Sequence, residues 1–155
     1  KELLETIIHH PNFEHFHLRR KGEHIEDWVF FEKIKNQLVV SSDIVSPFDV
    51  RKHGKSKLSY SRSAHTLEEL NSYKNPRVYI SPIYPSISKN NYSNNALLKE
   101  LELINVPKNA VALGGIELEK LSEIKSHGFE YCAVLGAVWQ SKKPIDACLE
   151  LLENG

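Results

Sequence analysis

The sequence predicts an α/β fold in which helices alternate with the strands of a parallel sheet. Three observations support this fold class: short apolar runs recur along the chain, segments with helical periodicity separate them, and the connections between them are short. This alternation is typical of right-handed βαβ units, whose helices pack on the sheet between two parallel strands. Both an open doubly wound sheet and a closed barrel fit the alternation.

Each expected element depends on the spacing of its apolar residues. Helices repeat apolar side chains every three to four residues, whereas strands are short apolar, β-branched or alternating runs. In chain order these patterns predict helix 3–8, strand 13–18, helix 26–34, strand 37–40, helix 48–53, strand 58–63, a helix after Thr66, strand 78–83, helix 95–104, strand 110–113, helix 117–126, strand 131–135 and helix 144–152.

Local signals define some of these boundaries. Thr66, followed three residues later by Glu69, forms a capping box that begins a helix. Gly54 and Gly128 are placed to end the helices that precede them, because glycine readily adopts the left-handed conformation of a C′ residue. No linker-like stretch divides the 155 residues, so we expect one β/α domain over residues 1–155.

The composition excludes several classes of protein. Lys and Arg number 20, as do Asp and Glu, so the chain has no overall field that would attract nucleic acid or an anionic membrane. No apolar run approaches the ~20 residues of a membrane helix, and we expect a cytoplasmic protein without nucleic-acid or membrane partners. The sequence contains no P-loop, HExxH zinc helix or GxSxG elbow. Cys132 and Cys148 are expected as buried, reduced thiols.

Polar residues that directly follow the strands are the candidates for a functional site, because the carboxyl ends of parallel strands meet at one edge. His17 and Arg19 share a face of their strand and Lys21 follows, an arrangement that suits a phosphate or pyrophosphate, although a solvated basic loop has the same composition. Asp43 follows Ser42 after the second strand, where it could hold Mg²⁺ against a pyrophosphate. Capping a helix is the alternative role of Asp43.

Three further groups of residues follow later strands. Ser63 and His65 share a face just before the N-cap Thr66, and of the eight histidines only His17 and His65 are expected at the site, the others at the surface. A long polar loop, which is either a ligand-binding lid or a solvated loop, contains Ser86, Ser88 and Lys89. Small residues after two successive strands would let backbone N–H groups approach an anion; they are Gly114, Gly115, Gly136 and Ala137.

Taken in order, the segments HLRRK, SSD, SAHTLEEL, YISPIYPSISK, VALGGI and AVLGAVW resemble the successive strand-end motifs of the thiamine phosphate synthase and TenI family, over about residues 16–139. The resemblance implies a (β/α)₈ TIM-type barrel and a role in thiamine biosynthesis. The synthases of this family join a hydroxymethylpyrimidine pyrophosphate to a thiazole phosphate with Mg²⁺ and release pyrophosphate. The TenI members include a thiazole tautomerase.

The resemblance also implies roles for individual residues. Arg19, Lys21 and Lys89 fall on pyrophosphate-binding positions, and His17 replaces the usual Gln there. Asp43 matches a metal-binding Asp, and Ser42 replaces an Asn that holds the pyrimidine. The remaining matches are Ser63 near the reacting pyrimidine, Ser86 and Ser88 on the thiazole phosphate side, and the backbone N–H groups of Gly114, Gly115, Gly136 and Ala137 around the phosphate.

The chain departs from the family pattern in three ways. Strand 1 has no counterpart before Lys1, and strand 4, with the acidic residue that follows it, is not evident between Gly54 and Leu58. Pro82 stands where tautomerase members carry a catalytic His, which disfavours tautomerisation. We therefore expect synthase-like transfer, a catalytically inert TenI-like protein that binds thiazole phosphate or has a regulatory role, or a structural subunit with a vestigial site. A homo-oligomer is compatible with the sequence.

Overall fold

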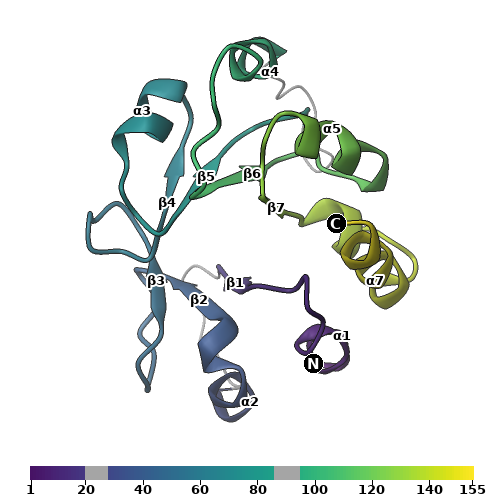
Figure 1. The fold of residues 1–155 in the computed structure, drawn as a ribbon. Coiled ribbons are helices and arrows are strands. Elements are labelled where there is room, and N and C mark those ends of the chain that lie inside the picture. Colours follow the sequence, from purple (N-terminus) through teal and green to yellow (C-terminus); the bar gives the residue numbers. More distant parts are fainter. Residues whose placement is uncertain (20–27, 86–94) are drawn as a thin grey trace.

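The computed structural model describes residues 1–19, 28–85 and 95–155 (Figure 1). In these ranges, seven parallel strands form one sheet in which neighbours in space are also neighbours in sequence. The strands are β1 (Phe16–Leu18), β2 (Leu38–Ser41), β3 (Arg51–His53), β4 (Ser61–Ala64), β5 (Arg77–Ile80), β6 (Ala110–Leu113) and β7 (Tyr131–Ala133).

Helices lie on the outer side of the curved sheet (Figure 1), although among the described residues none connects β2 to β3 or β3 to β4. They are α1 (Glu2–Ile7), α2 (Trp28–Lys33), α3 (Leu67–Ser72), α4 (Asn95–Leu101), α5 (Leu121–Ser126), α6 (Gly136–Trp139) and α7 (Pro144–Asn154), with 3₁₀ turns at η1 (Lys35–Gln37) and η2 (Leu118–Lys120). None of the described helices is long and apolar enough to cross a membrane.

The sheet is a half-barrel with two edges, because β1 and β7 each pair with only one of the described strands. Helices from both ends of the chain meet near this opening. α1 contacts α7, and the Asn12 side chain after α1 donates a 2.8 Å hydrogen bond to the carbonyl of Leu152 in α7. The Gln37 side chain donates to the carbonyl of Ile8 at 2.6 Å, which connects the end of α1 to the start of β2. The terminal helix therefore packs against the first helix of the chain.

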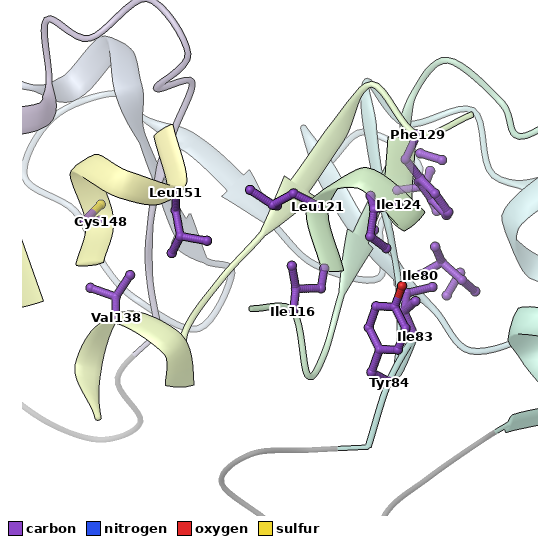
Figure 2. Close-up of a cluster of buried hydrophobic side chains, with 14 of the residues drawn as sticks. Ile80, Ile83, Tyr84, Ile116, Leu121, Ile124, Phe129, Val138, Cys148 and Leu151 are labelled. Carbon is purple, nitrogen blue, oxygen red and sulfur yellow. The ribbon is translucent and has the colours of Figure 1, made fainter. Parts of the chain in front are cut away.

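The alternation of side chains along each strand separates an outer core from an inner face. Outward-facing residues of the central strands are at most 1% exposed and pack with Leu70 of α3, Leu101 of α4 and Ile124 of α5; they are Ala64, Val78, Ile80, Ala110 and Ala112. Figure 2 shows another part of this core, where Ile83 and Tyr84 lie beside Ile80, and Val138 and Leu151 lie together. Burial of each large apolar side chain contributes about 1.5–3 kcal/mol.

A second, smaller apolar cluster covers the outside of the first strands. It contains Leu38 and Val40 of β2, with Trp28 and Phe31 of α2 packed against them. The Trp28 ring lies edge-on to the ring of Phe48, at 5.4 Å between centroids. This cluster makes α2 the outer layer over β1 and β2.

The expected helix at 48–53 is wrong, because Arg51–His53 is strand β3. Phe48 and Val50 both pack against the second apolar cluster, and residues two apart share a side only in extended chain. β3 pairs with β2 on one side and β4 on the other, so a strand does lie between them. The expectation of a missing strand in this region is thus not confirmed, and that of a missing strand before Lys1 stays a prediction.

The other expected elements are present, most of them with shifted ends. Strand 110–113 has the expected bounds, and the Thr66 hydroxyl caps α3 by accepting a hydrogen bond from the backbone N–H of Glu69. Gly128 has a φ of 87° at the end of α5, as a C′ glycine should. Both cysteines are free, but only Cys148 is buried: Cys132 is exposed on the edge strand β7.

Candidate active site at the carboxyl ends of the strands

All seven strands run in the same direction, so the residues after them lie at one rim of the half-barrel. Candidates from different parts of the sequence are brought to this rim. They are Arg19 after β1, Ser42 and Asp43 after β2, His65 after β4, Gly114 and Gly115 after β6, and Gly136 and Ala137 after β7. Lys21, Ser86, Ser88 and Lys89 lie outside the described residues.

Polar side chains occupy the inner face of the sheet below this rim. His53 lies beside Ser61 in the register of β3 and β4, and its Nδ1 is 2.9 Å from the Ser61 hydroxyl. The other ring nitrogen of His53, Nε2, is 3.1 Å from the Ser63 hydroxyl. His17 joins the group from β1, with Nε2 3.4 Å from the Ser61 hydroxyl. The His17 ring also stacks on Tyr79 of β5, at 5.0 Å between centroids.

The two imidazoles of this inner face are held in the neutral form. Burial lowers the pKa of His17 to about 3, and the adjacent His53 ring acts in the same direction. Burial also lowers the pKa of His53, and the positive charge of Arg19 adds to this effect. Arg19 is itself exposed at the end of β1. The arrangement therefore combines a guanidinium at the rim with neutral hydrogen-bonding groups beneath it.

His53 corrects the expectation that only His17 and His65 lie at the site. His15 corrects the expectation that the other histidines lie at the surface, because its side chain lies beside Arg51 and Tyr60 at the amino ends of the strands. Only 8% of the His15 side chain is exposed, and His53 forms the hydrogen bonds described above. The apolar pair Phe48 and Val50 was the signal in the sequence that could have placed His53 at the site. If residues 48–53 are extended, side-chain alternation places Arg51 and His53 on the face opposite Phe48 and Val50.

His65 and Ser63 are not brought together as their shared face predicts. Ser63 belongs to the inner polar group, whereas His65 is exposed beyond the end of β4. The Nδ1 atom of His65 lies 2.9 Å from the carbonyl oxygen of Ser81, and the backbone N–H of His65 donates to the Glu69 carboxylate at 2.7 Å. His65 thus connects the loops after β4 and β5.

Asp43 lies in an exposed turn after β2. No helix begins at Asp43, so its alternative role as a helix cap is wrong. The turn is fixed by the backbone N–H of Ser42, which donates to the His53 carbonyl at 2.8 Å. It also approaches Gly54 closely, since a Cβ on Gly54 would come within 2.8 Å of the Ser42 hydroxyl. The chain paths after β2 and β3 are therefore in direct contact.

Asp43 offers one carboxylate to a metal ion. Mg²⁺ is commonly bound by one or two carboxylates together with substrate phosphates. Among the described residues, no three His, Cys, Asp or Glu side chains gather into a metal site. This donor set fits an ion shared with a bound pyrophosphate, and it does not fit a site built from protein ligands alone.

The glycine pair after β6 packs tightly against the loop after β5. Gly114 and Gly115 have φ angles of 101° and 61°, which favour glycine. The N–H groups of Ile83 and Tyr84 donate to the carbonyls of Leu113 and Gly114, at 2.9 and 3.1 Å. A Cβ on Gly115 would come within 2.7 Å of the Tyr84 Cβ. Close packing of two loops therefore explains this pair without any ligand.

The same loop leaves backbone donors available. In the described part of the chain, no group accepts a hydrogen bond from the N–H of Gly114 or Gly115, nor from the N–H of Gly136 or Ala137 in the first turn of α6. β6 and β7 are neighbours, with Leu113 opposite Ala133, so both sets of donors follow adjacent strand ends. Unpaired backbone N–H groups in such loops are suited to phosphate oxygens.

At the amino ends of the strands, arginine side chains pair with a carboxylate and with aromatic rings. Arg77, the first residue of β5, binds both carboxylate oxygens of Glu14 and lies 3.9 Å from the centre of the Tyr131 ring. Arg51, the first residue of β3, lies over the Tyr60 ring at 4.9 Å. The inner polar group is thus bounded by this layer on one side and by the rim on the other.

Comparison with solved structures gives the fold. A thiamine phosphate pyrophosphorylase from Bacteroides thetaiotaomicron matches with a TM-score of 0.57 and 23% identity, over 98% of this chain and 83% of that one. A 3-hexulose-6-phosphate synthase matches with a TM-score of 0.62 and 12% identity, over 99% of this chain and 91% of that one. A thiamine phosphate pyrophosphorylase from Pyrococcus furiosus matches with a TM-score of 0.48 and 17% identity, over 91% of this chain and 58% of that one.

No protein-family model matches the sequence, and no curated protein sequence matches it significantly. These three solved structures are each less than 25% identical to this chain, so these likenesses establish the fold alone. That fold is an α/β half-barrel of parallel strands, consistent with an incomplete TIM-type barrel.

Proposed function

We propose that this protein is a thiamine phosphate synthase-like transferase, which joins a hydroxymethylpyrimidine pyrophosphate to a thiazole phosphate and releases pyrophosphate. One arrangement carries the proposal. A cationic side chain, Arg19, and two sets of backbone N–H groups that find no acceptor among the described residues follow strand ends at the same rim. The strand-end motifs resemble those of the synthases, and the fold likeness to a thiamine phosphate pyrophosphorylase supports the same reading.

The transfer breaks the bond between the pyrimidine methylene carbon and a pyrophosphate oxygen. The electron pair of that bond leaves with the pyrophosphate, positive charge develops on the pyrimidine, and a bond to the thiazole forms. Arg19 would stabilise the departing pyrophosphate, together with Lys21 and Lys89 as the resemblance implies. Asp43 and the pyrophosphate oxygens would hold Mg²⁺, which supplies further positive charge to the leaving group.

The neutral histidines beneath the rim suit a developing pyrimidine cation. An imidazolium at His17 or His53 would repel positive charge on the substrate, but burial lowers the pKa of both groups. Ser63 has its hydroxyl on the same face and would contact the pyrimidine. On the phosphate side, the thiazole phosphate would be bound by Ser86, Ser88 and the backbone N–H groups of Gly114, Gly115, Gly136 and Ala137.

A catalytically inert protein that binds thiazole phosphate is the second candidate. The observation that favours it is that no group of three metal-binding side chains forms among the described residues, at Asp43 or elsewhere. Such a protein would keep the phosphate-binding loops after β6 and β7 and would not carry out transfer.

Product formation distinguishes the two candidates. The protein is incubated with pyrimidine pyrophosphate, thiazole phosphate and Mg²⁺, and thiamine phosphate is quantified with and without a chelator. The transferase gives metal-dependent product, and Asp43→Asn lowers its rate. Asp49→Asn is the matched control, because Asp49 is also exposed and precedes β3 at its amino end. Binding of thiazole phosphate without product would support the inert protein.

A further inference from the structure

Four side chains form a continuous line of hydrogen bonds through the inner face of the sheet. Ser61 is fully buried, and its hydroxyl has two neighbours, His53 Nδ1 at 2.9 Å and His17 Nε2 at 3.4 Å. His53 continues the line, since its Nε2 lies 3.1 Å from the hydroxyl of Ser63. The line begins at His17 in β1, passes through Ser61 in β4 and His53 in β3, and ends at Ser63 in β4, near the rim.

The rings in this line are held in place from several sides. His17 stacks on Tyr79 and lies edge-on to His53, with 5.0 Å between centroids in both pairs. The His53 ring is in turn edge-on to Tyr79, at 5.7 Å. Reorienting one imidazole would therefore disturb its neighbours, and the hydrogen bonds have fixed partners.

A line of this kind has two consistent proton arrangements. A neutral imidazole donates from one nitrogen and accepts at the other, and a hydroxyl donates once. In the first arrangement His17 donates to Ser61, Ser61 to His53, and His53 to Ser63, so the Ser63 proton is free for a ligand. In the second, Ser63 donates to His53 and every bond is reversed, so Ser63 offers only lone pairs to a ligand.

We propose that His53 is a positioning residue, which orients the hydroxyl of Ser63 and sets, through its own tautomer, whether Ser63 donates to or accepts from the ligand. The identity of that ligand, a pyrimidine pyrophosphate, rests on the proposed function. The coupling between His53 and Ser63 does not, because it follows from the hydrogen bonds alone. Burial lowers the pKa of His17 and of His53, which keeps the rings in the neutral form that the line requires.

Two substitutions separate positioning from a structural role. An Asn side chain reaches the place of Nδ1 and a Gln side chain that of Nε2, so His53→Asn keeps the bond to Ser61 and His53→Gln keeps the bond to Ser63. Ser61 is the buried partner, so losing its hydrogen bond costs more stability than losing that of Ser63. His53→Asn should therefore be more stable than His53→Gln. For kcat we expect the reverse, with His53→Gln within about threefold of the wild type and His53→Asn at least about tenfold slower. A purely structural role would make kcat follow stability.

Nitrogen-15 NMR of the imidazole side chains tests the coupling without any turnover. In the free protein, Ser63→Ala should shift the Nε2 resonance of His53 and leave its Nδ1 resonance near the wild-type position, whereas Ser61→Ala should do the opposite. Excess pyrimidine pyrophosphate should shift Nε2 of His53 in the wild type and not in Ser63→Ala. If Ser63→Ala leaves both nitrogens unchanged in the free protein, the positioning role is excluded. If the ligand shifts neither nitrogen in the wild type, pyrimidine pyrophosphate is excluded as the ligand of Ser63. Product formation is a separate readout, so loss of the transferase proposal does not alter this result.

Discussion

Gly115 lies so close to Tyr84 that a methyl group on the glycine would come within 2.7 Å of the tyrosine Cβ. The φ of Gly115 is 61°, in the left-handed region, so a side chain would be strained there even without its neighbour. The contact joins the loops after β5 and β6, which border the candidate site. The geometry of the rim on this side therefore depends on a residue without a side chain.

Gly115→Ala should lower the free energy of unfolding by about 2–4 kcal/mol, because it combines a strained φ with overlap against Tyr84. Gly128→Ala is the matched control. Gly128 also has a positive φ, but the nearest atom to its added Cβ is on Val106 at 3.9 Å, so only about 1 kcal/mol should be lost. Urea unfolding of both variants measures the difference, and equal losses would contradict the overlap.

Asn75→Ala should destabilise the fold by about 1–3 kcal/mol, since it leaves the carbonyl of the buried residue Ser59 without its donor. Asn75 is 3% exposed, and its amide donates to the carbonyls of Ser59 at 2.7 Å and Ser56 at 3.2 Å. Asn71→Ala, at an exposed position of α3, should cost far less. The expectation fails if chemical denaturation gives the two variants the same stability.

His17 should make the protein less stable in acid. The folded-state pKa of His17 is about 3, against 6.5 for the free side chain, so between these values the unfolded chain binds more protons than the folded one. Stability from this group is therefore complete above about pH 6.5 and is lost as the pH falls towards 3, by at most about 1.4 kcal/mol per pH unit. His17→Gln should flatten the dependence of unfolding free energy on pH, whereas His65→Gln, at an exposed position, should not.

Arg19→Ala should slow thiamine phosphate formation by at least ~10²-fold, because the departing pyrophosphate loses a stabilising charge. Lys108→Ala serves as the control, since Lys108 is exposed just before the amino end of β6, away from the rim. Steady-state rates at saturating substrate measure the effect. A near-native rate for Arg19→Ala would remove Arg19 from the proposed site.

Much of the fold was predictable because its local and tertiary preferences agree. The run at Ala110–Leu113 is apolar on both faces and ends at a glycine pair, and it has the expected bounds. The cap of α3 also follows from local chemistry, since Thr66 accepts a hydrogen bond from the N–H of Glu69 regardless of what surrounds it. For the site, the parallel direction of the strands was sufficient to place Arg19, Asp43 and Gly114 at one rim.

The errors arise where tertiary contacts decide the conformation. The segment 48–53 is short and rich in charged residues, so its sequence pattern does not define a strand. β3 forms there because β2 and β4 pair with it on both sides. His53 was missed for that reason. His15 lies within the expected strand 13–18, two residues before His17 and therefore on the same face, so the alternation of that segment was an available signal. α6 has only four residues, too few for a repeating apolar pattern to define it.

The most direct test of the account is a titration of the ¹⁵N-labelled protein with inorganic pyrophosphate and Mg²⁺, followed by the backbone amide resonances. If the rim binds phosphate through the N–H groups that lack an acceptor in the described part of the chain, the amides of Gly114, Gly115, Gly136 and Ala137 should shift in a saturable way. The amide of Gly128, which donates to the carbonyl of Lys125 away from the rim, should stay in place. Saturable shifts elsewhere, with those four amides unchanged, would contradict the proposed site.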